Sequence, residues 1–80
     1  MLIKSNVAVS DNGFVFDPST GESFTLNNTG KEVLFLIKEG KGTDQITTIL
    51  IEKYDTDKET AERYLVDFIN DLRINNLLEE

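Results

Sequence analysis

Two tight-turn sequences stand close together in the first third of the chain and constrain its fold strongly. The first, Asp11-Asn12-Gly13, contains Asn-Gly, which favours a β-hairpin because both residues tolerate positive φ angles. The second, Asp17-Pro18-Ser19-Thr20-Gly21, suits a type I turn with proline at its second position. Short apolar stretches flank both turns. We therefore expect an antiparallel meander with strands near residues 6–10, 13–17 and 22–26.

The region after Leu26 changes to helical spacing of its apolar residues. A first helix is expected over about 28–39, with an apolar stripe formed by Val33, Leu34, Leu36 and Ile37. Its candidate N-caps are Asn27, Asn28 and Thr29, and Thr29 would form a capping box with Glu32. Gly40 is expected to end this helix in the left-handed conformation.

Two further helices are expected behind it. The second begins at Thr43, and its predicted buried face consists of Ile46, Ile49, Leu50 and Tyr54. The third follows Asp55-Thr56-Asp57, where Thr56 and Glu59 make a second predicted capping box. Its core positions are Ala61, Leu65, Phe68, Ile69 and Leu72. The closing Leu77 and Leu78 are expected to fold back onto the core.

These elements predict an α+β fold of the winged helix-turn-helix-like type: a three-stranded antiparallel meander followed by three helices. Eighty residues correspond to one domain, which we expect to span residues 1–80. A small sheet is not stable alone, so one of its faces must pack on the helices. We expect that face to carry Phe14, Phe16, Phe24 and Leu26.

Composition excludes several classes of function. The chain has no histidine and no cysteine, so the usual catalytic base, thiol nucleophiles and thiolate metal sites are all missing, and we expect neither an enzyme nor a bound cofactor. The formal net charge of −7 at pH 7 repels phosphate groups, so we do not expect the chain to bind nucleic acid. The longest apolar run, Val33–Ile37, is too short to span a membrane, and no signal peptide is recognisable, so we expect a cytoplasmic protein without a membrane partner.

Two motif-like stretches do not fulfil their motifs. The segment from Asp55 resembles the start of a calcium-binding EF-hand loop, but Thr60 stands where glycine is required and Val66 where a bidentate glutamate is required. A capped helix start explains the acidic residues there more simply, so no metal site is expected. Gly40-Lys41-Gly42-Thr43 lacks the remaining residues of a phosphate-binding loop and is expected to connect two helices.

A winged-helix DNA-binding or transcription-accessory domain is the alternative function, because the helix pair 43–54 and 57–73 has helix-turn-helix spacing. Its second helix would be the recognition helix, yet it carries Lys58, Arg63 and Arg73 against Glu59, Glu62, Asp67 and Asp71. Such a surface repels a duplex.

Two features exceed the needs of a core. Phe35 lies opposite the apolar stripe of its helix, so it either packs on the N-terminal residues Leu2 and Ile3 or contacts a second protein. The strand over 22–26 is an edge of the meander without proline or inward charge to block further pairing. An extended peptide can add to such an edge as a further strand, unless the edge is simply short and solvated.

The ordered set of residues resembles the PqqD-like peptide chaperones, also called RiPP recognition elements, over roughly residues 7–78. The resemblance rests on the Gly21 turn, Leu26-Asn27, Thr29-Gly30, Val33-Leu34, Leu36-Ile37, Gly40, Thr43, Ile46, Leu50, Tyr54, Phe68-Ile69, Leu72 and Leu77-Leu78. The chain departs from the family pattern at Phe35, usually polar, and at Asn76, where glycine often precedes the final leucines.

The resemblance implies a non-catalytic chaperone that binds the leader of a ribosomally made precursor peptide and presents it to a modifying enzyme, often a radical-SAM protein. In that family the leader adds to the third strand and lies against the third helix. The implied peptide-binding residues are Glu22, Ser23, Phe24, Thr25 and Leu26 on the strand, and Tyr64, Asp67, Phe68 and Asp71 on the helix. The precursor, the enzyme and the oligomeric state stay open.

Overall fold

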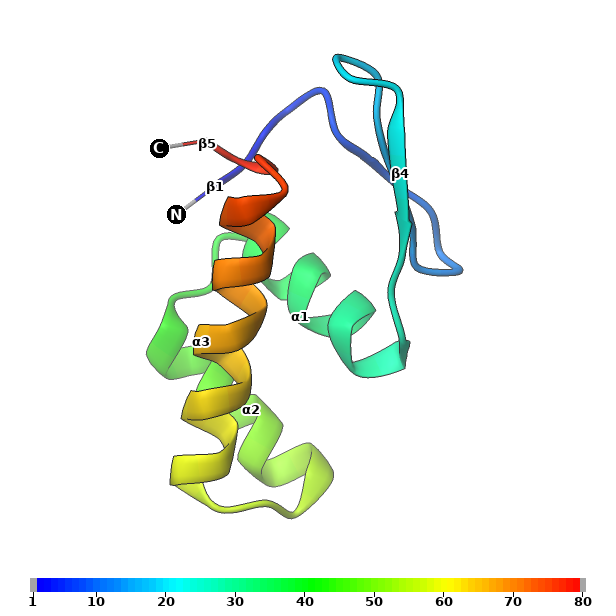
Figure 1. The fold of residues 1–80 in the computed structure, drawn as a ribbon. Coiled ribbons are helices and arrows are strands. Elements are labelled where there is room, and N and C mark those ends of the chain that lie inside the picture. The colour runs from blue at the N-terminus through cyan, green and yellow to red at the C-terminus, as the bar shows by residue number, and fades with distance from the viewer. Residues whose placement is uncertain (1, 80) are drawn as a thin grey trace.

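A computed structural model describes residues 2–79. The expected meander is present as β2 (Ala8–Val9), β3 (Phe14–Asp17) and β4 (Glu22–Thr25), in the spatial order β2-β3-β4. The three helices follow as α1 (Asn28–Lys38), α2 (Thr43–Tyr54) and α3 (Lys58–Ile74). The predicted α+β architecture is therefore confirmed. In Figure 1 the meander stands at one side of the molecule, α3 runs along the other, and α1 lies between them.

The inner face of the sheet differs from the expectation. Val15 is opposite Phe24 in the register, and Val15 is only 1% exposed. Phe14 and Phe16 lie on the opposite face and are 47% and 39% exposed. The prediction that these two phenylalanines face the helices is therefore wrong, because side chains alternate along a strand and Val15 occupies the core side.

Both predicted capping boxes are also wrong, although the helices begin within a residue or two of the expected positions. The Asn27 side chain, not that of Thr29, caps α1: its Oδ1 accepts a hydrogen bond from the Gly30 amide at 2.8 Å. In the same way Asp57 caps α3 by accepting from the Thr60 amide at 2.7 Å. In each case the Asx residue directly before the first helical residue accepts a hydrogen bond from one free amide of the first turn.

Two helices end in the same hydrogen-bonded motif. After α1, Gly40 has a φ of 89° and donates to Ile37 O, while Lys41 donates to Leu36 O. This Schellman motif confirms the predicted glycine stop. After α3, Asn76 has a φ of 59° and occupies the equivalent position. Asparagine tolerates this left-handed conformation, so asparagine in place of the glycine that the resemblance leads us to expect leaves the turn intact.

One hydrophobic cluster joins the sheet to all three helices, and its most deeply buried side chains are Val15, Val33, Leu34, Ile37 and Ile46. Leu77 and Leu78 are buried, as expected from the closing leucines. The final residues also form a strand that was not expected: β5 (Leu78–Glu79) pairs antiparallel with β1 (Leu2–Ile3), which brings the two ends of the chain together (Figure 1). Over residues 2–79, no helix has the length and apolar character needed to cross a membrane.

Tyr54, expected in the core, is instead 42% exposed. Its hydroxyl donates to Glu32 Oε2 at 2.7 Å, and Lys53 Nζ lies 2.7 Å from Glu32 Oε1. The hydrogen bond from Lys53, and to a smaller extent that from Tyr54, holds the pKa of the Glu32 carboxyl below its ordinary value. Glu32 therefore ties α1 to α2 and does not cap its own helix.

Candidate functional site: a groove between strand β4 and helix α3

Strand β4 is an edge of the sheet, as predicted, because β3 is its sole partner among the described strands. The Leu26 amide donates to Gly13 O at 2.8 Å, so Leu26 and Gly13 form a hydrogen-bonded pair. In an antiparallel ladder such pairs alternate with pairs that are not hydrogen-bonded to each other. Phe24, two residues earlier, directs its backbone groups toward β3. Ser23 and Thr25 must then direct their N–H and C=O groups outward, where a further strand would pair.

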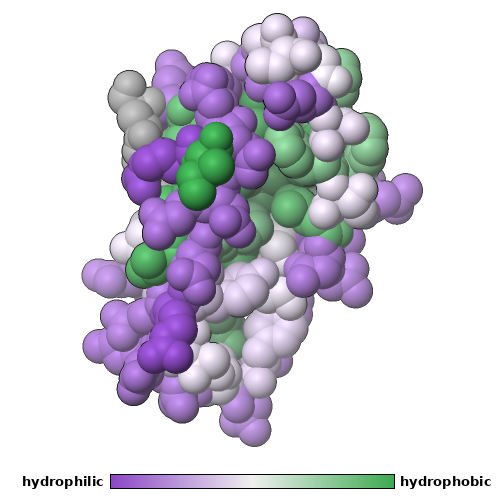
Figure 2. All heavy atoms as spheres, viewed as in Figure 1, coloured by the Kyte–Doolittle hydropathy of each residue, from purple (hydrophilic) through white to green (hydrophobic). Residues whose placement is uncertain are grey.

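A groove of about 550 Å³ runs between this edge and α3. Figure 2 shows apolar side chains gathered in the hollow between the sheet and the polar outer surface of α3. The sheet side and the adjoining start of α1 contribute Val15, Phe24, Thr25, Leu26, Asn27 and Gly30. The helix side and the chain that follows it contribute Tyr64, Asp67, Phe68, Asp71, Leu72, Asn75 and Leu77.

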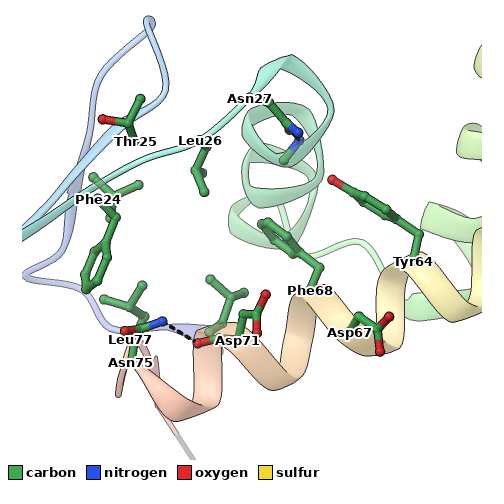
Figure 3. Close-up of a pocket in the computed structure, with 13 residues that line it drawn as sticks. Phe24, Thr25, Leu26, Asn27, Tyr64, Asp67, Phe68, Asp71, Asn75 and Leu77 are labelled. Atoms are coloured by element: carbon green, nitrogen blue, oxygen red, sulfur yellow. Dashed lines mark hydrogen bonds between the residues drawn. The ribbon is translucent and has the colours of Figure 1, made fainter.

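An aromatic pair forms part of the helix wall. The rings of Tyr64 and Phe68 lie one turn apart on α3 and stack with centroids 6.2 Å apart and planes 11° apart. Phe68 reaches the start of α1, where a Cβ on Gly30 would lie 3.2 Å from its Cε1 atom. The absence of a side chain at Gly30 therefore lets the ring lie close to α1 (Figure 3). Burial raises the pKa of Tyr64, with a further rise from nearby Tyr54, so its hydroxyl is protonated at neutral pH.

The groove is acidic at its helix side. Asp67 and Asp71 line it and both are exposed, and none of the lining residues in the described part of the chain is basic. Within residues 2–79 neither carboxylate takes part in an ion pair. Asn75, the next residue along the stripe, donates from Nδ2 to the Asp71 carbonyl at 2.8 Å (Figure 3). The two carboxylates are therefore available to a basic group in the groove.

The structure brings most of the implied peptide-binding residues together. Seven line the groove: Phe24, Thr25, Leu26, Tyr64, Asp67, Phe68 and Asp71. Glu22 and Ser23 belong to β4 but lie outside the groove. Asn75 and Leu77 were not anticipated, although Asn75 continues the helical spacing of Tyr64, Phe68 and Asp71 and could have been found from it. Val15 was missed because the inner face of β3 was assigned to its neighbours.

Phe35 lies apart from this groove. It is half-buried and lines a second hollow between α1 and α2, beside Lys53 and Tyr54. The residue is thus less exposed than a position opposite the apolar stripe suggests. Its proposed role as a partner contact is separate from the groove.

Comparisons with known proteins agree with this geometry. Residues 13–78 match the family described as Coenzyme PQQ synthesis protein D (PqqD). The structure of TbiB1 in complex with the TbiA(beta) leader peptide is 32% identical, with a TM-score of 0.89 over 99% of this chain and 95% of that one. A lasso peptide synthetase B1 complexed with its leader peptide has the same fold, at 22% identity and a TM-score of 0.83 over 91% and 89%. No curated protein matches the chain significantly.

Proposed function

The chain belongs to the PqqD family, and we propose that it binds the leader segment of a ribosomally synthesised precursor peptide and presents it to a modifying enzyme. The observation that carries this proposal is the position of the open β4 edge directly beside an apolar groove. Support also comes from TbiB1, a protein with 32% identity to this chain whose structure contains a leader peptide.

The peptide adds to β4 as a further strand in this proposal. Its backbone pairs with the outward groups of Ser23 and Thr25, which supplies affinity that is independent of sequence. Every second side chain of the peptide then faces the groove and contacts Phe24, Leu26 and the Tyr64–Phe68 pair, which supplies selectivity. Glu22 borders the strand and completes the proposed peptide-binding residues.

The domain acts without catalysis in this proposal, as a binding module spanning residues 1–80 in the cytoplasm. The modifying enzyme supplies the chemistry, and the domain supplies recognition of the leader. Such a division suits a chain without histidine and cysteine.

Titration with the TbiA(beta) leader peptide tests the proposal directly. We expect saturable binding with a dissociation constant on the order of micromolar or tighter, because ordering a flexible peptide offsets much of the contact energy. In an isotope-labelled protein, amide shifts should concentrate at Ser23, Thr25 and along α3. Shifts that map to the β2 edge instead would contradict the proposed surface, and a wild-type protein that does not bind would contradict the function.

Reversal of the groove charge should weaken this binding. Asp67→Lys combined with Asp71→Lys is expected to reduce affinity severalfold for a leader that carries a lysine or arginine near the groove, at about 0.2–1 kcal/mol per exposed pair. The loss should shrink as salt rises, since screening weakens such pairs. Glu59→Lys with Glu62→Lys gives a control of equal charge change on α3, since neither residue lines the groove. Equal effects of the two double variants would rule out a local role for the carboxylates.

Duplex DNA is not expected to bind. The groove side of α3 presents Asp67 and Asp71 where a recognition helix would present basic side chains. An anisotropy titration at low salt, where electrostatic attraction is strongest, should give no saturable signal. Saturable duplex binding there would favour the winged-helix DNA-binding alternative.

Phe35 is proposed as a contact of the modifying enzyme. The motivation is its position in the hollow between α1 and α2, away from the peptide groove. Phe35→Ser should weaken association with the enzyme and leave leader affinity unchanged. Loss of leader binding in the folded variant would show instead that the residue supports the groove indirectly.

A further inference from the structure

The groove has an uncharged neighbour at the corner between α2 and α3. This corner hollow has a volume of about 260 Å³, and its floor is formed by the buried side chains of Leu50 and Ala61. Tyr54 stands at its wall, and Tyr64 lines both the corner hollow and the groove. The two spaces therefore adjoin at a single shared aromatic residue.

The corner hollow differs chemically from the groove. Its remaining lining consists of Thr29, Thr56 and Thr60, so no charged side chain among residues 2–79 lines it, whereas two carboxylates line the groove. An apolar floor with a hydroxyl rim suits one bulky apolar side chain whose backbone stays at the rim. A cavity of about 150 Å³ already admits a benzene ring, so the space is sufficient for such a side chain.

The direction of β4 leads a bound peptide toward this hollow. Figure 3 shows Phe24 near Leu77 and Asn75 at the end of α3, and Asn27 on the side of Tyr64. A strand lying along β4 therefore passes Tyr64 as it leaves the sheet beyond Leu26. From Phe68 to Ala61 the helix rises about 10 Å, which an extended chain spans in about three residues.

We infer that the corner hollow is a second recognition site for the same peptide and takes a bulky apolar side chain. Antiparallel pairing is the more stable arrangement per residue, so this side chain lies about three residues N-terminal to the peptide residue opposite Phe68. The inference rests on the proposed function, since it requires a peptide on β4. The same peptide is thus bound at two adjoining sites, the acidic groove and the uncharged corner hollow.

The test fills the hollow without touching the groove. Thr60 is exposed, lines the corner hollow and is absent from the groove, so Thr60→Phe places an aromatic ring at the site. Glu62→Phe adds the same ring to the same part of α3, but outside both spaces, and serves as the matched control. Both folded variants are titrated with the TbiA(beta) leader peptide and with the same peptide lacking the residues N-terminal to its paired segment.

Thr60→Phe should bind the full peptide about tenfold more weakly than Glu62→Phe, because a buried apolar contact is lost. The truncated peptide should bind both variants equally. In the wild-type protein, only the full peptide should shift the amides of Thr29, Thr56 and Thr60, a readout that does not depend on the variants folding. If the wild type binds the peptide but neither difference appears, the second site is wrong and the peptide-binding function stands. A wild type that does not bind overturns both.

Discussion

Thr25→Pro should abolish most of the leader affinity while leaving the domain folded. The Thr25 amide points away from β3, so proline removes a donor from the open edge without breaking the existing ladder. Its ring also occupies the space through which a fourth strand approaches. We expect a loss of about tenfold or more, since a net hydrogen bond of about 1 kcal/mol is lost together with close strand contact. Isothermal titration with the TbiA(beta) leader peptide measures this loss.

Thr25→Val is the matched control, because valine keeps the amide and the β-branched shape of threonine. Its affinity should stay close to that of the wild type. Circular dichroism and the melting temperature of Thr25→Pro must also stay near the wild-type values, since proline shifts φ slightly. Unchanged binding by a folded Thr25→Pro variant would contradict strand addition at β4, even if the groove contributes.

Local signals predicted the elements of this fold well because they depend on neighbouring residues. Asn12-Gly13 and the Pro18–Gly21 segment specify turns, and Gly40 specifies a helix end, through backbone conformations that few residues adopt easily. These positions appear in the structure as expected. The exact N-caps were less predictable, because several adjacent Asx and threonine residues compete for the same role.

The face of β3 could not be read from its sequence. Phe14-Val15-Phe16 is apolar at all three positions, so the pattern does not alternate and does not show which side chains face the core. Tertiary packing decides, and Val15 lies against the helices. The strand pair β1–β5 was likewise beyond sequence reasoning, since it joins two dipeptides at opposite ends of the chain.

The candidate site was predictable where it followed helical spacing. Tyr64, Asp67, Phe68 and Asp71 lie at intervals of one turn, so their common face on α3 follows from the sequence. The close approach of Gly30 to Phe68 depends on how α1 crosses α3, and no local signal reports that. Leu77 joins the groove for a similar reason, because the turn at Asn76 directs it back toward β4.

Val15→Ser should be far more destabilising than Phe14→Ser, although phenylalanine is the larger residue. Val15 is fully buried opposite Phe24, so serine removes apolar contacts and places a hydroxyl in the core, at about 3 kcal/mol. Phe14 is half exposed on the outer face, so its replacement should stay within about 1 kcal/mol. Urea unfolding of both variants measures the two costs.

The same substitution should also weaken leader binding at elevated temperature. A domain of this size has only about 5–10 kcal/mol of stability, so Val15→Ser removes a large share of it and loosens the sheet wall of the groove. Leader affinity should therefore fall as temperature approaches its lowered melting point, while Phe14→Ser binds as the wild type does throughout. If Phe14→Ser were instead the more destabilising change, the sheet would face the helices through its phenylalanines. In this register the side chains of Ser23 and Thr25 would then face the groove in place of that of Phe24.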